Sequence, residues 1–129
     1  MRLGRSALEG RGPNDRGSAS VEFALVIPIL VLILFMVVVA GSVYVDQLHL
    51  QTAARNAARA GSVSSTTACS TASSELANEN VGTLQCTVLQ TCTAGGFKVQ
   101  LVANRTVVMP IIGNRSVTLR ATSTYTCST

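Results

Sequence analysis

The chain has 129 residues, of which 47% are hydrophobic, 12% are charged and only 4% are aromatic, and its formal net charge is +4. So low a share of charged residues argues against a disordered acidic or basic tail protein. The basic residues are thinly scattered and lack interleaved aromatic residues, which argues against nucleic-acid binding. The longest stretch without a charge, residues 23–45, is a candidate membrane segment. The residues left after it are too few for the core of a large enzyme.

The first 17 residues, MRLGRSALEGRGPNDRG, form a polar segment rich in Gly and Arg. They offer no apolar face that could pack against a core. We therefore interpret residues 1–17 as a flexible leader in front of a helix that spans about residues 18–61.

The apolar segment, residues 23–45, is long enough to cross a lipid bilayer. At 1.5 Å per residue it spans about 34 Å as a helix, against a hydrocarbon core of about 30 Å. Sixteen of its residues are Leu, Ile, Val or Phe, which favour insertion. Pro28 removes one backbone donor and leaves the carbonyl of Ala24 without its helical partner, so we expect a helix kink there.

The arginines on either side of this segment predict its orientation. Arg55 and Arg59 follow it closely, whereas four arginines precede it: Arg2, Arg5, Arg11 and Arg16. Because positively charged flanks favour the cytoplasmic side, we predict a single-pass membrane protein with a cytoplasmic N-terminus. The segment from residue 62 to residue 129 then lies outside.

All four cysteines, Cys69, Cys86, Cys92 and Cys127, lie beyond the membrane segment. An even number in a short extracytoplasmic segment predicts two disulfides. Their spacing does not suit a zinc site, in which the ligands usually occur in closely spaced pairs. Three connectivities are possible, and the sequence does not choose among them.

The junction between leader and helix has an unusual order of features. A signal peptidase cuts after an apolar core, whereas here the polar leader ends at Gly17, just before the apolar run. This order resembles the signal of type IV prepilins, which are cut after a Gly with a Glu five residues later. The resemblance implies cleavage between Gly17 and Ser18, with Glu22 as the carboxylate that pairs with the amine of a neighbouring subunit. Gly4 and Glu9 share the spacing but lie far from the helix.

Two stretches, GSASVEFALVIP from Gly17 and AARNAARAG from Ala53, are similar to the TadE-like family. These proteins are minor pilins, or pseudopilins, of the tight-adherence (Flp) pilus system. The resemblance implies a subunit of the bacterial cytoplasmic membrane that acts in pilus assembly, initiation or adhesion and can be incorporated in a surface pilus. It implies as partners a prepilin peptidase, other pilin or pseudopilin subunits, the assembly platform and the cytoplasmic membrane. Neither nucleic acid nor a cofactor is expected.

The helical pattern continues past the membrane segment on a face of small residues. They recur at three- and four-residue steps: Leu50, Ala53, Ala54, Ala57, Ala58 and Gly61. This face either packs on the chain's own outer domain or contacts another subunit, because small residues allow close approach in both cases. Gly61 and the Ser/Thr run after it are expected to end the helix near Ala60.

Residues 62–129 predict a small α+β domain. We expect a short helix over 71–81 with Gly82 as its stop, then strands over 83–91, 97–109 and 116–126 in an antiparallel meander. The expected loops are 93–96 and Pro110–Arg115. Together with the long transmembrane helix this is a pilin-like architecture.

No catalytic, cofactor or metal site is predicted, because the one histidine, His49, lacks partners at suitable spacing. Two rival hypotheses remain. Signal peptidase could cut after Ala40 and release a small disulfide-bonded domain. The chain could also be an uncleaved single-pass anchor that displays a binding domain.

Overall fold

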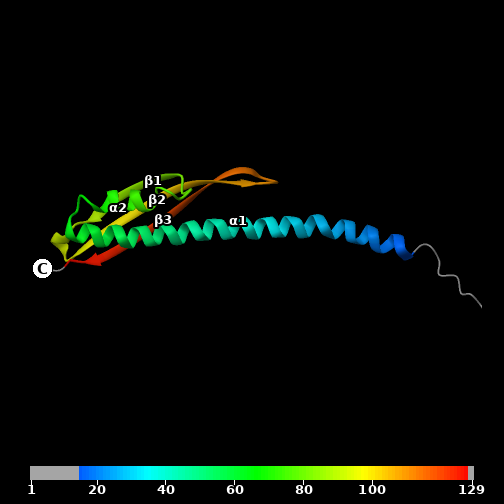
Figure 1. The fold of residues 1–129 in the computed structure, drawn as a ribbon, viewed down its shortest axis with the longest axis horizontal. Coiled ribbons are helices and arrows are strands. Elements are labelled where there is room, and N and C mark those ends of the chain that lie inside the picture. Colours follow the sequence, from blue (N-terminus) through cyan, green and yellow to red (C-terminus); the bar gives the residue numbers. More distant parts are fainter. Residues whose placement is uncertain (1–14, 128–129) are drawn as a thin grey trace, which may run out of the picture. The chain divides into compact units, whose positions relative to one another are not determined.

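The computed structural model describes residues 15–127 and holds, over this range, a long helix, a short helix and a three-stranded antiparallel sheet (Figure 1). The elements in chain order are α1 (Asp15–Val63), α2 (Ala68–Glu75), β1 (Thr83–Gln90), the single turn η1 (Cys92–Ala94), β2 (Gly96–Met109) and β3 (Gly113–Thr126). The α+β class with a long apolar N-terminal helix is confirmed. Residues 1–14, most of the expected leader, lie outside the described residues.

The chain divides into two compact units between Val37 and Val38. In the described range the first unit consists of α1 up to Val37. The second unit contains the rest of α1, together with α2 and the sheet. The helix runs three residues further at its C-terminal end than the expected Ala60, so Gly61 does not end it.

The sheet has the order β1-β2-β3, and both pairs are antiparallel. The expected strands are therefore present, in the expected meander. β2 is the central strand, and along it buried and less buried residues alternate, as a strand with one covered face requires. The register of β1 shifts between Val88 and Gln90, which leaves Leu89 out of the pairing at the end of that strand.

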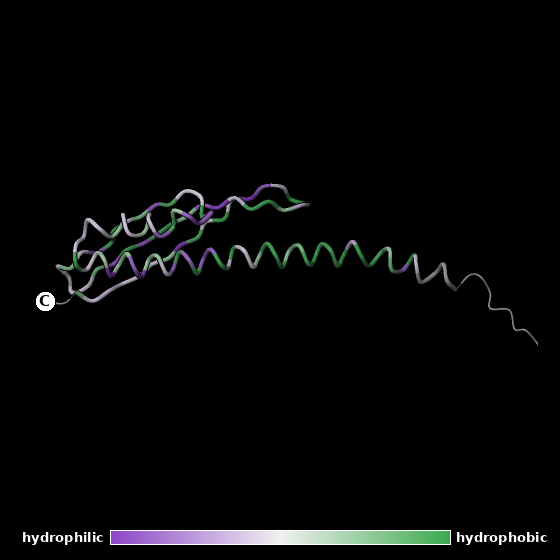
Figure 2. The backbone as a smooth tube through the Cα atoms, in the orientation of Figure 1, coloured by the Kyte–Doolittle hydropathy of each residue, from purple (hydrophilic) through white to green (hydrophobic). Residues whose placement is uncertain are grey.

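The core of the second unit lies between α1 and the sheet. The small-residue face of α1 packs against the inward residues of β2 and β3, which are Phe97, Val99, Leu101, Ala103, Leu119 and Ala121. Ala57 and Ala58 are fully buried. Of the two alternatives for this face, packing on the chain's own domain is therefore the one that the structure contains. Figure 2 shows the alternating hydropathy along the strands that supplies the other half of this core.

Gly61 has a packing role within α1. A Cβ at this position would overlap the ring of Phe97, which is itself fully buried. The glycine therefore lets the large ring of β2 lie directly against the helix backbone. The helix continues to Val63 because glycine lowers helix propensity without breaking the hydrogen-bond pattern.

The short helix lies earlier than predicted. α2 covers Ala68–Glu75, whereas the sequence pattern predicted residues 71–81. Ala68 and Ala72, one turn apart, are both buried in the core, so tertiary packing selects this earlier stretch. Gly82 is not a helix stop but the residue just before β1, with a φ of 73° and no room for a Cβ beside the carbonyl of Asn104.

The turn between β2 and β3 is tighter than the predicted loop Pro110–Arg115. Pairing continues to Met109 and Gly113, so only Pro110–Ile112 remain in the turn. Pro110 has the fixed φ that suits the start of a turn, and Gly113 takes the positive φ of 79° that ends it. Cross-strand pairing therefore incorporates Asn114 and Arg115 into β3.

Two disulfides staple the second unit, and the structure resolves their connectivity. Cys69 in α2 is bonded to Cys86 in β1, and Cys92 in η1 is bonded to Cys127 after β3. The sequence separations are 17 and 35 residues. Loops of these lengths correspond to stabilisation of about 3 and about 4 kcal/mol by the chain-entropy estimate, which matters in a unit with so small a core.

Candidate functional site

The predicted processing junction lies at the start of α1. Gly17 and Ser18 fall in the first turn of the helix, which begins at Asp15. Glu22 follows one turn after Ser18, and its side chain is exposed. Among the residues whose side chains the structure describes, from Ser20 onward, no ion pair of Glu22 is present. Cleavage itself and the pairing role of Glu22 stay predictions.

The helix behind this junction has the length and composition to cross a membrane. A helical stretch from Ser20 to Val63 meets both conditions, and the most apolar 18-residue window in it has none of its residues buried. Figure 2 shows the continuous hydrophobic run along this part of α1. The chain stays helical through Pro28, and the kink there stays a prediction. An exposed surface made of large apolar side chains is suited to lipid.

A charged pair ties the sheet to α1 just after the apolar segment. Asp46 is 7% exposed, and its carboxylate forms an ion pair with the guanidinium of Arg105 on β2. The same guanidinium donates to the carbonyl oxygen of Ser42 at 3.5 Å. The Gln47 amide donates to the carbonyl oxygen of Arg120 on β3 at 2.8 Å. These contacts hold both long strands against the helix at one end of the second unit.

The amino-acid sequence alone assigns Asp46 and Arg105 no role beyond their charge. A signal for the pair was present in the alternation of β2. Arg105 occupies the next inward position after Leu101 and Ala103, where a charge needs a partner. Asp46 is the first acidic residue after the apolar run, but the sequence does not show that the two positions meet.

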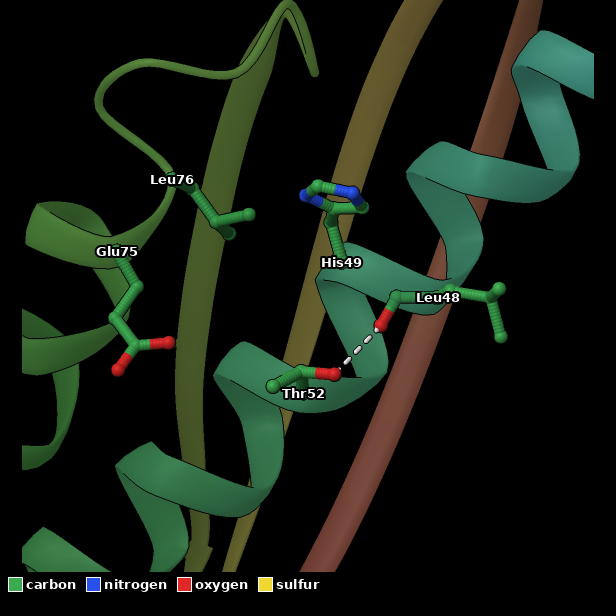
Figure 3. Close-up of a pocket in the computed structure, with 5 residues that line it drawn as sticks. All are labelled: Leu48, His49, Thr52, Glu75 and Leu76. Carbon is green, nitrogen blue, oxygen red and sulfur yellow. Dashed lines mark hydrogen bonds between the residues drawn. The ribbon is translucent and has the colours of Figure 1, made fainter.

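A surface pocket lies between α1 and the end of α2, lined by Leu48, His49, Thr52, Glu75 and Leu76 (Figure 3). His49 Nδ1 lies 3.0 Å from Oε1 of Glu79, so the histidine has a carboxylate partner that sequence spacing did not reveal. The Thr52 hydroxyl points along the helix and donates to the carbonyl oxygen of Leu48 at 3.0 Å. That bond occupies the hydroxyl proton, so the threonine does not donate it to His49.

The polar contacts around this pocket join α1 to the segment that carries α2. Besides the His49–Glu79 pair, the Asn56 amide donates to both carboxylate oxygens of Glu75, at 2.8 and 3.0 Å. Within the described residues no group of three or more His, Cys, Asp or Glu could hold a metal ion. All four cysteines are in disulfides. These contacts join α1 to α2 and to the residues that follow α2.

Comparison with known families gives a match in the N-terminal part of the chain. Residues 17–59 match the family model described as TadE-like protein. This part of the chain is similar to the TadE-like family. The match confirms the resemblance inferred from the residues around Gly17 and Ala53, and it ends just before the helix does. No curated protein and no solved structure is significantly similar to the chain.

The TadE-like segment coincides with α1 almost over its whole length. It therefore contains the predicted junction, the exposed apolar surface and the alanine face that packs on the sheet. The sheet, α2 and both disulfides lie outside the match. The part of the chain that matches the family model is therefore the helix.

Proposed function

We propose that the chain is a minor pilin-like (pseudopilin) subunit of a tight-adherence pilus, made as a precursor and cut between Gly17 and Ser18 by a prepilin peptidase. The TadE-like match supports association with this pilus system in general. The observation that carries the finer proposal is that the match begins at Gly17 and that the candidate membrane helix begins directly behind it. A peptidase acting at the membrane face requires that order.

In this proposal α1 anchors the subunit in the cytoplasmic membrane, with its N-terminus in the cytoplasm and the second unit outside. The excess of arginines before the apolar segment supports this orientation. Two disulfides in so small a unit support an oxidising compartment for it. The subunit takes part in assembly, initiation or adhesion and carries out no reaction of its own.

Glu22 has a defined role in the proposed filament. Cleavage after Gly17 leaves a free amine on Ser18, and a carboxylate within apolar surroundings is costly unless paired. At about 4 Å and an effective dielectric near 20, pairing with the amine of a neighbouring subunit gains about 4 kcal/mol before desolvation. The exposure of Glu22 leaves it accessible to such a neighbour.

The N-terminus of the mature protein tests the proposal, and mass spectrometry of membrane and culture fractions measures it. We expect the native chain to start at Ser18 and the Gly17→Leu variant to keep its leader. Gly4→Leu is the matched control, because Gly4 has the same spacing to Glu9 but lies away from the helix. This control is expected to be cut normally.

The rival hypotheses give different N-termini. A start at Gly41 in the medium would identify a secreted domain released by signal peptidase, and an uncut native chain in the membrane would identify a simple anchor. Either result overturns the proposal. A Glu22→Ala variant separates processing from assembly, since we expect it to be cut at Gly17 but to enter pili poorly, with Glu9→Ala as its control.

A further inference from the structure

The tip of the β2–β3 hairpin is apolar and exposed. The exposed fractions are 62% for Val108, 67% for Ile111 and 52% for Ile112. Turns in water are ordinarily polar, and residues 62–129 are otherwise rich in Ser and Thr. Figure 2 shows the hydrophobic colour returning at this tip. An apolar tip on a polar domain indicates a surface that contacts another molecule or a membrane.

The hairpin also extends past the rest of the sheet. β1 begins at Thr83, which pairs with Asn104, so beyond that residue only β2 and β3 are paired. Their pairing continues as far as Met109 and Gly113. A two-stranded ribbon is marginally stable in water by itself. The extension would therefore be stabilised by a surface that covers its tip.

The contacts with α1 determine the direction in which the tip points. Phe97, near the start of β2, packs on Gly61, whereas Arg105 pairs with Asp46. β2 therefore runs back along α1 toward Val38, the first residue of this unit. The strand ends four residues after Arg105, about 13 Å further on. From Asp46 to Val38 the helix covers about 12 Å, so the tip is level with Val38.

Residues 38–45 are the last part of the apolar segment 23–45, and in this unit Val38 and Val45 are exposed. A tip level with Val38 therefore lies on the membrane side of the point where the segment ends. Arg115 is exposed and stands across the ladder from Val107, close behind the tip. A basic side chain beside an apolar anchor is the usual arrangement of groups that insert among lipid headgroups.

We propose that the β2–β3 tip, Val108–Ile112, inserts into the membrane that α1 crosses, in the leaflet next to the second unit, with its side chains among the acyl chains just below the headgroups. Arg115 then lies at the level of the lipid phosphates. The tip is a second anchor that fixes the folded unit against the bilayer surface. This inference rests on the membrane-anchored state in the proposed function and does not depend on cleavage or pilus assembly.

Because the native chain contains no Trp, a single introduced tryptophan reports the depth of its own position. We would reconstitute the full-length Ile111→Trp variant in vesicles of phosphatidylethanolamine and phosphatidylglycerol, and measure quenching by lipids brominated near the glycerol end of the acyl chain. Leu89→Trp is the matched control, since Leu89 is exposed and lies at the opposite end of the sheet. Leu32→Trp, within the apolar segment, controls for the membrane anchor.

We expect the tryptophan of Ile111→Trp to be quenched at least about threefold more strongly than that of Leu89→Trp, because it lies among acyl chains. Ile112→Trp repeats the test at a second exposed position. Quenching by aqueous iodide equal to that of Leu89→Trp, with no quenching by lipid, would overturn the inference. So would a tryptophan that neither iodide nor brominated lipid quenches, because that result identifies protein, such as a second copy of the chain, as the cover.

The Leu32→Trp variant separates this inference from the proposed function. If its tryptophan is quenched by bromines near the chain ends while that of Ile111→Trp is not, the anchor stands and the tip insertion is wrong. If the tryptophan of Leu32→Trp is itself unquenched, the membrane anchoring in the proposed function fails together with the inference.

Discussion

The apolar residues of α1 differ in size between the first unit and the second. In the first unit the helix exposes large side chains, and Leu34, for example, is 65% exposed. In the second unit the same helix buries alanines, such as Ala57 and Ala58, completely. Fluid lipid closes around a large side chain, whereas a rigid sheet reaches the helix backbone closely only across small ones. Side-chain size, rather than hydrophobicity alone, separates the surface suited to lipid from the surface that binds protein.

The two units also differ in how much tertiary packing stabilises them. No residue of the most apolar stretch of α1 is buried, so tertiary packing contributes little there. The second unit combines a compact core, two disulfides and a buried ion pair. Substitutions in the second unit should therefore change the free energy of unfolding, and matched substitutions in the first unit should not.

The largest difference is expected between two leucines. Leu101 is fully buried at the centre of β2, whereas Leu32 lies in the exposed apolar stretch of α1. Leu101→Ala removes packed methyl groups and should lower the free energy of unfolding by about 3 kcal/mol. Leu32→Ala should leave it unchanged. Urea unfolding of the full chain in detergent, followed by circular dichroism of the sheet, measures both, and equal effects would refute the division.

A smaller effect is expected at the two helix glycines that flank the alanine face. A Cβ at Gly61 would overlap the Phe97 ring, whereas a Cβ at Gly41 meets nothing within 4 Å. Gly61→Ala should therefore destabilise the second unit by about 2 kcal/mol through overpacking. Gly41→Ala should be neutral or mildly stabilising, because alanine favours helix.

The same urea titration tests the glycines, and a rescue identifies the cause. Adding Phe97→Leu to Gly61→Ala makes room for the new methyl group, so the pair should lose less stability than the sum of the single changes. Strictly additive effects would show that the ring contact is not the reason for the glycine.

The smallest difference is expected between two ion pairs. The Asp46–Arg105 pair is largely buried, whereas the side chains of His49 and Glu79 are 42% and 35% exposed. Asp46→Asn leaves the guanidinium without its counter-charge, and because the Arg105 side chain is 24% exposed this should cost about 1–2 kcal/mol, less than the loss from a fully buried pair. Glu79→Gln should cost less than about 0.5 kcal/mol, because exposed pairs contribute little.

Double-mutant cycles distinguish these pairs from general surface effects. Arg105→Gln combined with Asp46→Asn should show a coupling free energy above about 0.5 kcal/mol, and His49→Gln combined with Glu79→Gln should show almost none. Equal coupling in the two cycles would contradict the assignment of the buried pair as the tie between sheet and helix.

Features that depend on local pattern could be predicted from the amino-acid sequence. The uncharged run of residues 23–45 predicts the apolar helix, and the small-residue steps from Leu50 to Gly61 predict its buried face. The three strands were also predicted, because alternation and turn residues are visible over short windows. The order of leader, glycine and apolar run predicts a processing junction at Gly17, where the family match begins, and cleavage there stays a prediction.

Contacts between residues that are distant in the chain could not be predicted in this way. The pairing of Cys69 with Cys86 and of Cys92 with Cys127, the contact of Phe97 with Gly61 and the Asp46–Arg105 pair all join separate elements. The position of α2 and the tight turn before Gly113 also depended on packing and cross-strand pairing. Local patterns specify which face of a helix or strand is apolar. The register in which two such faces meet depends on the shapes of both faces, so it is set only when the elements pack together.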